Sequence, residues 1–500
     1  MSATDRLARG ARPGSRMLAT DALFWYAEEA TPELRPLVGA ILILDRLPDR
    51  ERLQQLLARW IVRVPRLRQR VVEAPLHLGL PEWEDDPHFE LEYHARDVVL
   101  PEPGTDAHLF EFASAVFATP LDHLRPLWEA YLIEGLEGGR AACFFKVHHT
   151  VMDGVASMAG FDTLTQAHRA EPVRVPEAMP LHAPRPVTVR VARLIRELLS
   201  STTETMGAAA GFALQMVLHP AVAGDGVVRA IRGVRGVVRD LSTPGIHDPL
   251  ADATTGIGRR LDGLTFSMAR LRRIKEALGV TLNDVILTVV SGAVGRYHVY
   301  RGVHVDELHC MVPISLRQEG ERHALGNRVG MCNVALPVSE PDALIRLDVI
   351  RRQTTAAKND RRGAAYPLVM RALTFMPSAV FRLLAQAVTG RINLVCTNVP
   401  GPPTTRYLAG AKIEAMYPFA PVAVGTPLSV AVLSYADVCG IGIDTDPAAI
   451  PDPERLHRYL GEAVDDLERR ARVRPPVAVK VKVHRATRKG HDGRAQRAAS

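Results

Sequence analysis

A proline-rich stretch near the middle of the chain limits what this sequence can fold into. Five prolines fall within residues 172–186, and residues 171–258 are otherwise rich in arginine and small side chains. Because proline lacks a backbone N–H and fixes its φ angle, no long helix or central strand runs through residues 172–186. The 500 residues are 47% apolar and 23% charged, which is ordinary globular composition and excludes a disordered chain or a coiled coil. We therefore expect two folded domains joined by a crossover.

Before the crossover, apolar runs predict buried strands, and apolar residues at helical spacing predict helices. The segments expected to be regular are strands at residues 38–44 and 143–147 and helices at residues 49–64 and 155–168. Pro65 ends the first of these helices. A further amphipathic turn or helix begins near Asp21, with Thr20 as its expected N-cap.

After the crossover, strands and helices again alternate irregularly. The expected strands are residues 261–269, 310–314, 331–336, 394–398, 428–434 and 440–443, and the expected helices are residues 271–278, 282–299, 342–359, 366–388 and 454–470. Two groups of this kind predict an α+β (mixed α/β) fold with two domains. The expected divisions are a flexible basic leader (1–16), an N-terminal domain (17–170), a proline-rich, helical crossover (171–258), a C-terminal domain (259–470) and a basic, disordered tail (471–500). The helices expected in the crossover are residues 188–218 and 226–241.

The net charge of +7 is concentrated at the end of the sequence. Residues 471–500 hold nine Lys or Arg and one acidic residue, a net +8, which leaves −1 for residues 1–470. The basic pI of about 9.3 therefore describes the tail, and we expect no nucleic-acid-binding body. A solvated end is the favoured interpretation of the tail, with contact to anionic lipid as the alternative.

Cysteine usage and hydropathy indicate the expected location. The five cysteines are widely spaced and form no C-x-x-C pair, so we expect reduced thiols packed as small apolar side chains in the cytoplasm. No apolar run precedes Met17, so we expect no signal peptide. The nearest approach to a membrane-spanning run is residues 206–218, which is too short to cross a bilayer but can lie on one.

The most informative motif is His148-His149-Thr150-Val151-Met152-Asp153-Gly154, which follows an apolar strand and opens a helix. Adjacent side chains in an extended chain point to opposite sides, so one histidine enters a given cavity and the other is buried or structural. An ordinary pKa of about 6.5 suits histidine to general-base catalysis at neutral pH. Asp153 can orient the loop through a salt bridge, and Gly154 lets the backbone turn into the helix.

Three interpretations of this motif compete. A metal site would use His148, His149 and Asp153, but adjacent histidines diverge and no further ligand cluster is visible, so we expect no metal. Two purely structural histidines are the second interpretation. General-base catalysis is favoured, because two histidines at a strand end followed by Asp-Gly are hard to explain by packing alone.

The motif resembles the HHxxxDG signature of the CoA-dependent acyltransferase superfamily. Other segments resemble blocks of the bacterial wax ester synthase/diacylglycerol acyltransferase family, in that family's order. They are residues 20–24, 126–129 (Pro-Leu-Trp-Glu), 282–287 (with Asn-Asp), 312–317, 326–330, 397–402, 407–411 and 433–435. The resemblance extends from about residue 17 to about residue 470.

This resemblance implies an enzyme that transfers a fatty acyl group from acyl-CoA to diacylglycerol, giving triacylglycerol, or to a long-chain alcohol, giving a wax ester. It implies two chloramphenicol-acetyltransferase-like domains with an active-site tunnel between them, His149 at the middle, and no cofactor besides the co-substrate acyl-CoA. Because such alcohols lie in membranes, we expect a cytoplasmic protein attached peripherally to the inner membrane or to lipid inclusions.

The residues agree with direct acyl transfer. No G-x-S-x-G elbow supports a serine acyl-enzyme. His149 would take the proton from the alcohol, whose oxygen attacks the thioester carbonyl, and would return it to the departing CoA thiolate. The oxyanion needs a hydrogen-bond donor, and Asn283 is the candidate from the family's Asn-Asp block. The alternative for Asn283 is a helix N-cap.

Other candidate residues have structural alternatives. We expect His148 and Asp153 to support the geometry of the site. Arg317 and Arg328 are candidates to pair with Asp153 or with CoA phosphates, or are ordinary salt bridges. The candidates for substrate binding, whose alternative is packing or fixing turns, are Gly154, Pro126, Trp128 and Asn398. Ser429 stands near a position where family members often carry asparagine, which bears on the choice of alcohol.

Two other functions stay open at this point. A condensation-type or polyketide-associated acyltransferase would take its acyl group from a carrier-protein thioester, but the sequence contains no carrier or adenylation domain. A non-enzymatic lipid-surface protein would have no need of the His148-His149 pair and Asp153.

Overall fold

The computed structural model describes most of both expected domains. The described residues are 16–31, 34–75, 79–152, 160–175, 181–192, 195–196, 245–253, 258–315, 329–359, 379, 382, 391–422 and 425–473. The helices expected over 188–218, 226–241 and 366–388 lie wholly or mostly outside these residues, as does most of the basic tail.

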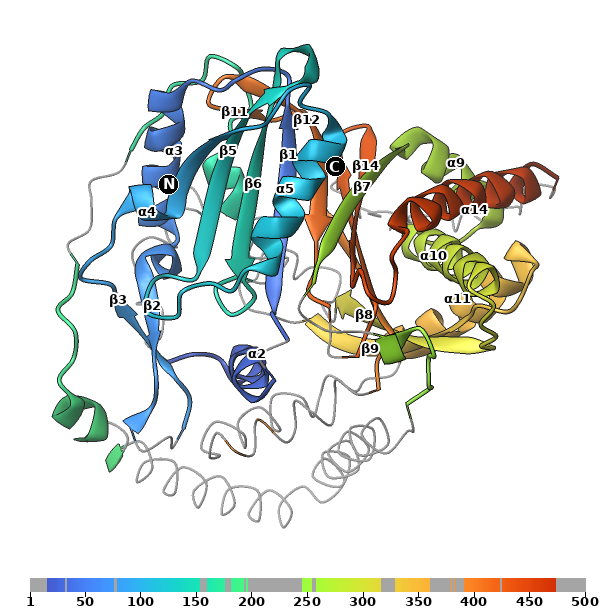
Figure 1. Ribbon diagram of the computed structural model, residues 1–500, viewed down its shortest axis with the longest axis horizontal. Helices are drawn as coiled ribbons and strands as arrows, with labels where there is room; N and C mark the ends of the chain where they lie inside the picture. Colours follow the sequence, from blue (N-terminus) through green and yellow to red (C-terminus); the bar gives the residue numbers. More distant parts are fainter. Residues whose placement is uncertain are drawn as a thin grey trace, which may run out of the picture.

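The first of two six-stranded sheets is built mainly from the N-terminal half of the chain (Figure 1). Its strands, in spatial order, are β11 (Tyr407–Leu408), β12 (Ala411–Phe419), β1 (Leu37–Leu44), β6 (Arg140–His148), β5 (Trp128–Leu136) and β4 (Ala95–Val99). Only β4 and β5 pair in parallel; every other neighbouring pair is antiparallel. The strands expected at 38–44 and 143–147 are therefore neighbours at the centre of this sheet.

Helices and a small hairpin flank the first sheet. They are α2 (Ala19–Ala30), α3 (Arg50–Arg63), α4 (Leu91–His94), α5 (Asp106–Ala118), the 3-10 turns η1 (Pro65–Arg68) and η3 (Glu137–Gly139), and the paired strands β2 (Gln69–Val72) and β3 (Glu82–Asp85). The Asp49 side chain accepts a hydrogen bond from the Arg52 N–H and caps α3, whose apolar face is buried as its spacing predicts. The Thr20 N-cap was wrong: α2 begins at Ala19, two residues earlier than expected, and its N-cap residue Leu18 provides no side-chain cap.

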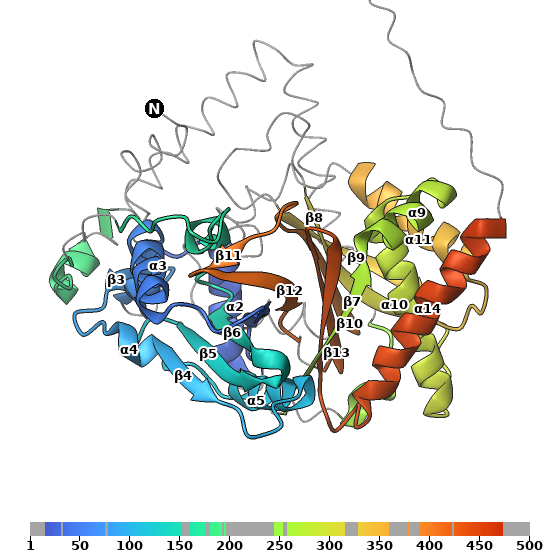
Figure 2. The same ribbon diagram turned by 90° about the horizontal axis from the view of Figure 1, so that it is seen from above.

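The second sheet is mixed. Its strands, in spatial order, are β7 (Arg260–Ser267), β14 (Val438–Thr445), β13 (Leu428–Tyr435), β10 (Leu394–Pro400), β8 (Glu307–Ser315) and β9 (Val329–Pro337). Strand β10 runs parallel to both of its neighbours, and the remaining pairs are antiparallel. The helices α9 (Met268–Leu278), α10 (Leu282–Tyr300), α11 (Ala343–Asn359) and α14 (Pro453–Val473) lie together along one side of this sheet (Figure 2), and the 3-10 turn η4 is Ala251–Ala253.

The turn between α9 and α10 shows why these two apolar segments do not form one helix. Gly279 adopts a left-handed conformation (φ +66°) and closes α9. Thr281 then caps α10 by accepting a hydrogen bond from the Asp284 N–H, while Asp284 accepts from the Thr281 N–H in return. The break expected between the helices at 271–278 and 282–299 is therefore confirmed.

The two halves of the chain are not fully separate, because β12 crosses back. Residues 411–419 come from the second half of the sequence but pair with β1 of the first sheet. In Figure 1 this orange strand lies beside the blue one. Strand β14 packs tightly on β12: a Cβ added at Gly440 or Gly442 would lie within 2 Å of the carbonyl oxygens of Met416 or Pro418. Glycine is therefore required at both positions.

Candidate active site

The His148-His149 pair lies at the end of β6, between β1 and β5 of the first sheet. The His148 N–H donates to the carbonyl of Leu127 at 3.0 Å, just before β5. The His149 N–H donates to the carbonyl of Pro36 at 2.7 Å, just before β1. Both neighbouring strands therefore fix the backbone of the pair.

The side chain of His148 is fully buried and both of its ring nitrogens are engaged. The Thr150 N–H donates to Nδ1 at 3.2 Å, and Nδ1 also lies 2.7 Å from Thr150 Oγ1. A backbone N–H can only donate, so Nδ1 acts as an acceptor and the ring proton lies on Nε2. Nε2 therefore donates to Glu28 Oε2, 3.1 Å away on α2. His148 thus fixes Thr150, the residue that follows His149.

His149 has different surroundings. It is half-buried, and its ring stacks on Phe24 of α2 with the centroids 4.1 Å apart and the planes at 28°. Phe24 and Glu28 are one helical turn apart, so the same face of α2 contacts both histidines. Glu28 was not predicted from the sequence; its spacing of four residues from Phe24 in a helical segment was the available signal.

The Pro-Leu-Trp segment anchors the start of β5. Pro126 is buried, and the Trp128 side chain is 0% exposed. The Trp128 ring stacks on His94 at 4.8 Å, and its Nε1–H donates to the carbonyl of Leu67 at 2.6 Å. This burial gives Trp128 a packing role beneath the strand end, while direct contact of Pro126 or Trp128 with substrate stays a prediction.

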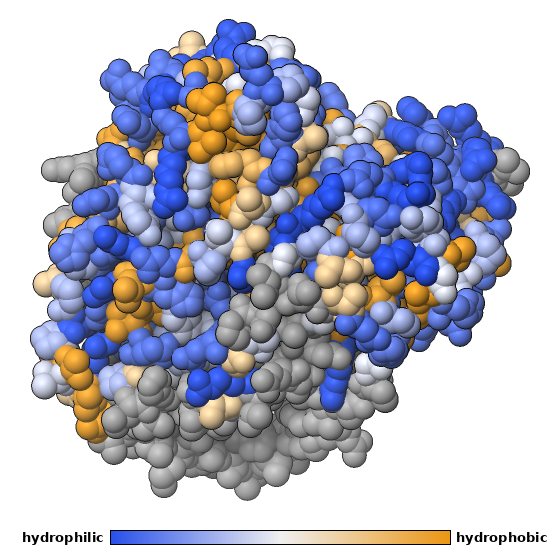
Figure 3. Space-filling view, in the orientation of Figure 1, coloured by the Kyte–Doolittle hydropathy of each residue, from blue (hydrophilic) through white to orange (hydrophobic). Residues whose placement is uncertain are grey.

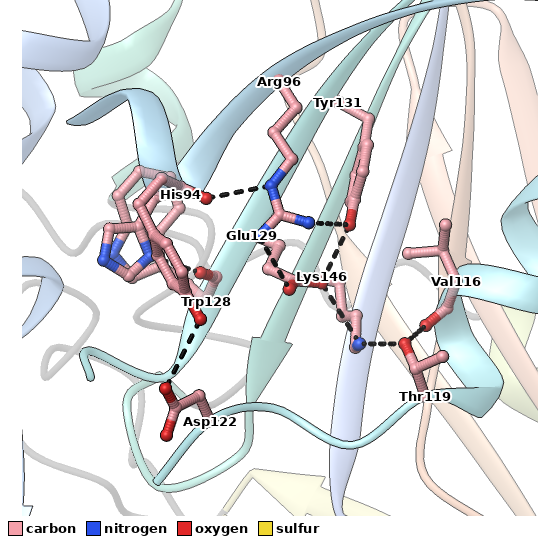
Figure 4. Close-up of polar contacts among 10 residues, drawn as sticks. His94, Arg96, Val116, Thr119, Asp122, Trp128, Glu129, Tyr131 and Lys146 are labelled. Carbon is pink, nitrogen blue, oxygen red and sulfur yellow. Dashed lines mark hydrogen bonds and ion pairs between the residues drawn. The ribbon is translucent and has the colours of Figure 1, made fainter. Parts of the chain in front are cut away.

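A buried polar cluster is centred on Lys146, which precedes His148 by two residues on β6 (Figure 4). The Lys146 side chain is 0% exposed, and its Nζ lies 3.2 Å from Glu129 Oε2 and 3.1 Å from Thr119 Oγ1. Burial lowers the pKa of Lys146, and the charge of Glu129 opposes that effect. Tyr131 also donates to Glu129, at 3.0 Å. These contacts tie β5 and β6 to the end of α5.

Asn283 occupies the second position of α10, because Thr281 is the N-cap. The alternative of an N-cap role for Asn283 was therefore wrong. Its side chain is half-buried and has no hydrogen-bond partner among the residues that the structure describes. The adjacent Asp284 is the structural member of the block: it is 2% exposed, accepts from Thr281, and accepts from Thr354 Oγ1 of α11 at 2.7 Å.

The remaining predicted residues divide into two sets. Asn398 is half-buried on β10, in register with Val432 of β13. Ser429 of β13 is fully buried and pairs in register with Asp444 of β14. The predicted residues that lie outside the described part of the chain are Asp153, Gly154, Arg317 and Arg328. The tunnel expected between the domains stays a prediction.

The described residues include every cysteine and contain no cluster of metal ligands. All five cysteines are described and none forms a disulfide, and four of them are buried, as expected for small apolar side chains. Within the described ranges, no group of three His, Cys, Asp or Glu could hold a metal ion. No described helix is by itself long and apolar enough to cross a membrane, although α9 and α10 together, bent by 99°, pass a test of length and composition.

Solved structures define the class of this fold. A wax ester synthase/diacylglycerol acyltransferase from Marinobacter aquaeolei matches with a TM-score of 0.61 and 25% identity, over 92% of this chain and 100% of that one. The first condensation domain of the CDA synthetase matches with a TM-score of 0.58 and 16% identity, over 93% and 98% of the two chains. The fold is therefore that of two-domain acyltransferases and condensation domains, which confirms the predicted mixed α/β, two-domain architecture.

Within this class, sequence comparison identifies the family. The wax ester synthase/diacylglycerol acyltransferase catalytic domain matches residues 17–286, and the C-terminal domain of the same family matches residues 325–468. The chain belongs to the wax ester synthase/diacylglycerol acyltransferase family, and the predicted resemblance and enzyme class are confirmed.

Named relatives agree with this assignment. A putative diacylglycerol O-acyltransferase of Mycobacterium tuberculosis is 30% identical over 443 residues, 88% of this chain and 89% of the relative. The O-acyltransferase WSD of Acinetobacter baylyi is 30% identical over 391 residues, 77% of this chain and 83% of the relative.

Proposed function

We propose that this protein transfers a fatty acyl group from acyl-CoA to the hydroxyl of diacylglycerol or of a long-chain alcohol, with His149 as the general base. The difference between the two histidines carries the proposal. Both ring nitrogens of His148 are engaged by Thr150 and Glu28 in the protein interior. His149 is half-buried and held by a stacked ring and a backbone hydrogen bond. His149 is therefore the better candidate to meet a substrate hydroxyl.

In the proposed reaction, His149 removes the proton from the alcohol as its oxygen attacks the thioester carbonyl. The C–O bond forms and a tetrahedral oxyanion develops. When the intermediate collapses, the C–S bond breaks, and His149 returns the proton to the CoA thiolate. The products are an ester and free CoA, and the reaction needs no cofactor besides the co-substrate acyl-CoA.

Asn283 is the proposed donor to the oxyanion. An amide N–H₂ can donate a hydrogen bond, and the Asn283 side chain has no partner among the described residues. Loss of one such donor typically lowers the rate by roughly 10²–10³. Asp284 supports this position from within the helix, because its carboxylate fixes the first turn of α10.

The names of the relatives support both alcohols as acceptors. The Mycobacterium tuberculosis relative is named for diacylglycerol, and the Marinobacter structure for both wax ester and diacylglycerol chemistry. Both acceptors are lipids, so we place the reaction in the cytoplasm at a membrane or lipid-inclusion surface. On the face shown in Figure 3, apolar side chains gather in patches among hydrophilic ones, which supports contact with such a surface.

The test is acyl transfer by the purified protein from palmitoyl-CoA, with dioleoylglycerol and hexadecanol offered in parallel. Release of CoA and formation of the ester are both measured. We expect activity with at least one alcohol, and a loss of roughly 10²–10⁴ in His149→Ala, the range for removal of a general base. His304→Ala is the matched control, because the His304 side chain is 83% exposed.

Two results would contradict the proposal. Folded wild-type protein that transfers the acyl group to neither alcohol would reject these acceptors, and transfer only from a carrier-protein thioester would favour the condensation-type alternative. Full activity in His149→Ala would reject His149 as the base.

A further inference from the structure

Glu28 of α2 lies between two imidazoles that come from distant parts of the sequence. Its Oε2 lies 3.1 Å from Nε2 of His148 and 3.1 Å from Nε2 of His123. The side chains of Glu28 and His148 are 9% and 0% exposed, whereas that of His123 is 41% exposed. A hydrogen-bonded row therefore leads from the protein surface at His123 to the residue next to His149.

Trp25, which lies on α2, packs against both histidines of this row. Its ring lies 4.5 Å from that of His123 and 6.1 Å from that of His148, measured between centroids. With Phe24 stacked on His149, three side chains within a little more than one turn of α2 contact the row or the pair. The helix thus fixes the position of both histidines and not only that of the buried one.

The two imidazoles keep the buried carboxylate ionised. Burial alone would raise the pKa of Glu28, but hydrogen bonds from His123 and His148 outweigh it and lower the pKa to about 2. Burial lowers the pKa of His123, and the hydrogen bond and charge of Glu28 outweigh it, so that pKa is raised. Other charged groups also act on the row: Glu29 and Asp122 on His123, and Arg35 on Glu28.

We propose that Glu28 is a positioning residue for acyl transfer, acting through His148, and that His123 keeps the Glu28 carboxylate in place. Glu28 holds the His148 proton on Nε2, which leaves Nδ1 to accept from the Thr150 N–H. Without Glu28 the His148 ring can carry its proton on Nδ1, which would break the hydrogen bond from the Thr150 N–H. The backbone on the C-terminal side of His149 would then loosen.

This assignment rests on the proposed function, because it concerns the geometry of the base in that reaction. A misplaced base slows the chemical step without weakening substrate binding. The role of Glu28 therefore predicts a lower kcat at an unchanged KM for acyl-CoA. A purely structural role for Glu28 would lower the amount of folded enzyme and leave the kcat of the folded fraction unchanged.

The first experiment compares Glu28→Ala, Glu28→Gln and the matched control Glu29→Gln in the palmitoyl-CoA assay, with active protein normalised by folded fraction. Glu29 is the neighbouring carboxylate and pairs with Arg382 instead, at 3.3 Å. We expect kcat to fall by roughly 10–100-fold in Glu28→Ala, by analogy with the hydrogen-bond partners of metal-ligating histidines. Glu28→Gln should fall less, since its amide oxygen still accepts from His148, and Glu29→Gln should match the wild type.

A second experiment does not depend on activity. Diethyl pyrocarbonate reacts with neutral imidazole, so the pH dependence of His123 modification, followed by peptide mass spectrometry, gives the pKa of that residue. Removing the carboxylate charge in Glu28→Gln removes the effect that raises this pKa. The half-reaction pH should therefore fall in Glu28→Gln, because the burial that lowers the pKa of His123 is then no longer outweighed by the charge of Glu28.

His123→Gln tests the proposal if the Glu28 variants do not fold. Its amide can still donate to Glu28 but carries no charge, so the pKa of Glu28 should rise. At pH 8, where an ordinary imidazole base is neutral, kcat should fall less in His123→Gln than in His123→Ala, which removes the donor to Glu28. Equal kcat in the wild type and both variants would reject the role of His123.

The two levels of proposal fail in different ways. Wild-type protein without acyl transfer contradicts the proposed function. Active wild-type protein whose Glu28→Ala variant keeps its full kcat, or whose His123 pKa is unchanged in Glu28→Gln, overturns the role of Glu28.

Discussion

Two buried carboxylates, one in each half of the protein, differ in what surrounds them. Glu28 lies among the N-terminal elements and is hydrogen-bonded to two imidazoles. Asp444 lies on β14 of the second sheet and is 1% exposed. Neither of its carboxylate oxygens has a hydrogen-bond partner among the described residues, and the nearest cation, Arg259, is 3.8 Å away. The pKa of Glu28 falls to about 2, whereas burial raises that of Asp444 to about 7.

This difference shows that hydrogen-bond partners, and not the degree of burial, decide whether a buried carboxyl group is ionised. Burial raises the pKa of both carboxyl groups. At Glu28, hydrogen bonds to the ionised form more than offset this effect of burial. At Asp444 the attraction of Arg259 is weaker than burial, and the charge of Asp446 adds to the effect of burial. Glu28 is thus a fixed negative charge at neutral pH, and Asp444 is close to half-protonated.

The largest expected effect is on Asp444→Asn. Because the folded-state pKa is raised from 3.8 to about 7, the folded protein binds more protons than the unfolded chain between those values. Asp444 therefore imposes no penalty below about pH 4 and an increasing penalty up to about pH 7, roughly 4 kcal/mol at about 1.4 kcal/mol per pKa unit. Asp444→Asn should stabilise the protein at pH 8 and change little at pH 4.

Urea denaturation at both pH values measures this effect. The control is Asp437→Asn, an exposed acid in the turn between β13 and β14. A stability gain in Asp444→Asn that is equal at pH 4 and pH 8 would show that Asp444 does not titrate as described.

Glu28 should give a pH dependence of the opposite sign. Its folded-state pKa is lowered from 4.5 to about 2, so it stabilises the protein above about pH 4.5 and loses that contribution as the pH falls towards 2. The contribution corresponds to roughly 3 kcal/mol. Thermal unfolding between pH 5 and pH 3 should show a steeper loss in the wild type than in Glu28→Gln. Parallel curves for the two proteins would contradict the pairing.

A third buried carboxylate, Asp284, accepts hydrogen bonds from threonines, whereas Glu28 is bonded to imidazoles and Asp444 has no hydrogen-bond partner among the described residues. Its Oδ1 accepts from Thr354 Oγ1 at 2.7 Å, and its Oδ2 accepts from Thr281. Thr354→Val keeps the shape but leaves Oδ1 without this donor, which should cost about 1–3 kcal/mol. The free energy of unfolding from urea titration measures it. A value near zero would show that the tie between α10 and α11 contributes nothing net.

Much of this architecture could be predicted from local sequence signals. Apolar runs located β1, β6, β8, β10, β13 and β14, and helical spacing with Gly279 located α9 and α10. Strand β12 was not expected, because its pairing with β1 joins residues almost 400 positions apart and no local pattern records such a contact. Strand β5 was also not expected, although its sequence is largely apolar and its antiparallel partner β6 lies close in the chain.

In the candidate site, too, residues in a contiguous motif could be predicted, and residues that the fold brings together from distant segments could not. His148 and His149 were evident because their motif is contiguous. Glu28 and His123 were not, because the fold brings three separate segments together around one oxygen atom. A local prediction also failed at the start of α10. Asn283 was the alternative N-cap, but the N-cap residue is Thr281.

The smallest expected effect is on Ser429, which lies opposite Asp444 in the second sheet. Its side chain is fully buried, and its hydroxyl has no hydrogen-bond partner among the described residues. Removing a buried hydroxyl that makes no bond avoids its desolvation cost, so Ser429→Ala should change the free energy of unfolding by less than about 1 kcal/mol, in the stabilising direction. Thr354→Val is the comparison, because it removes a bonded hydroxyl. A loss in Ser429→Ala as large as that in Thr354→Val would show that Ser429 donates to Asp444, and the contrast between the two carboxylates would then be smaller.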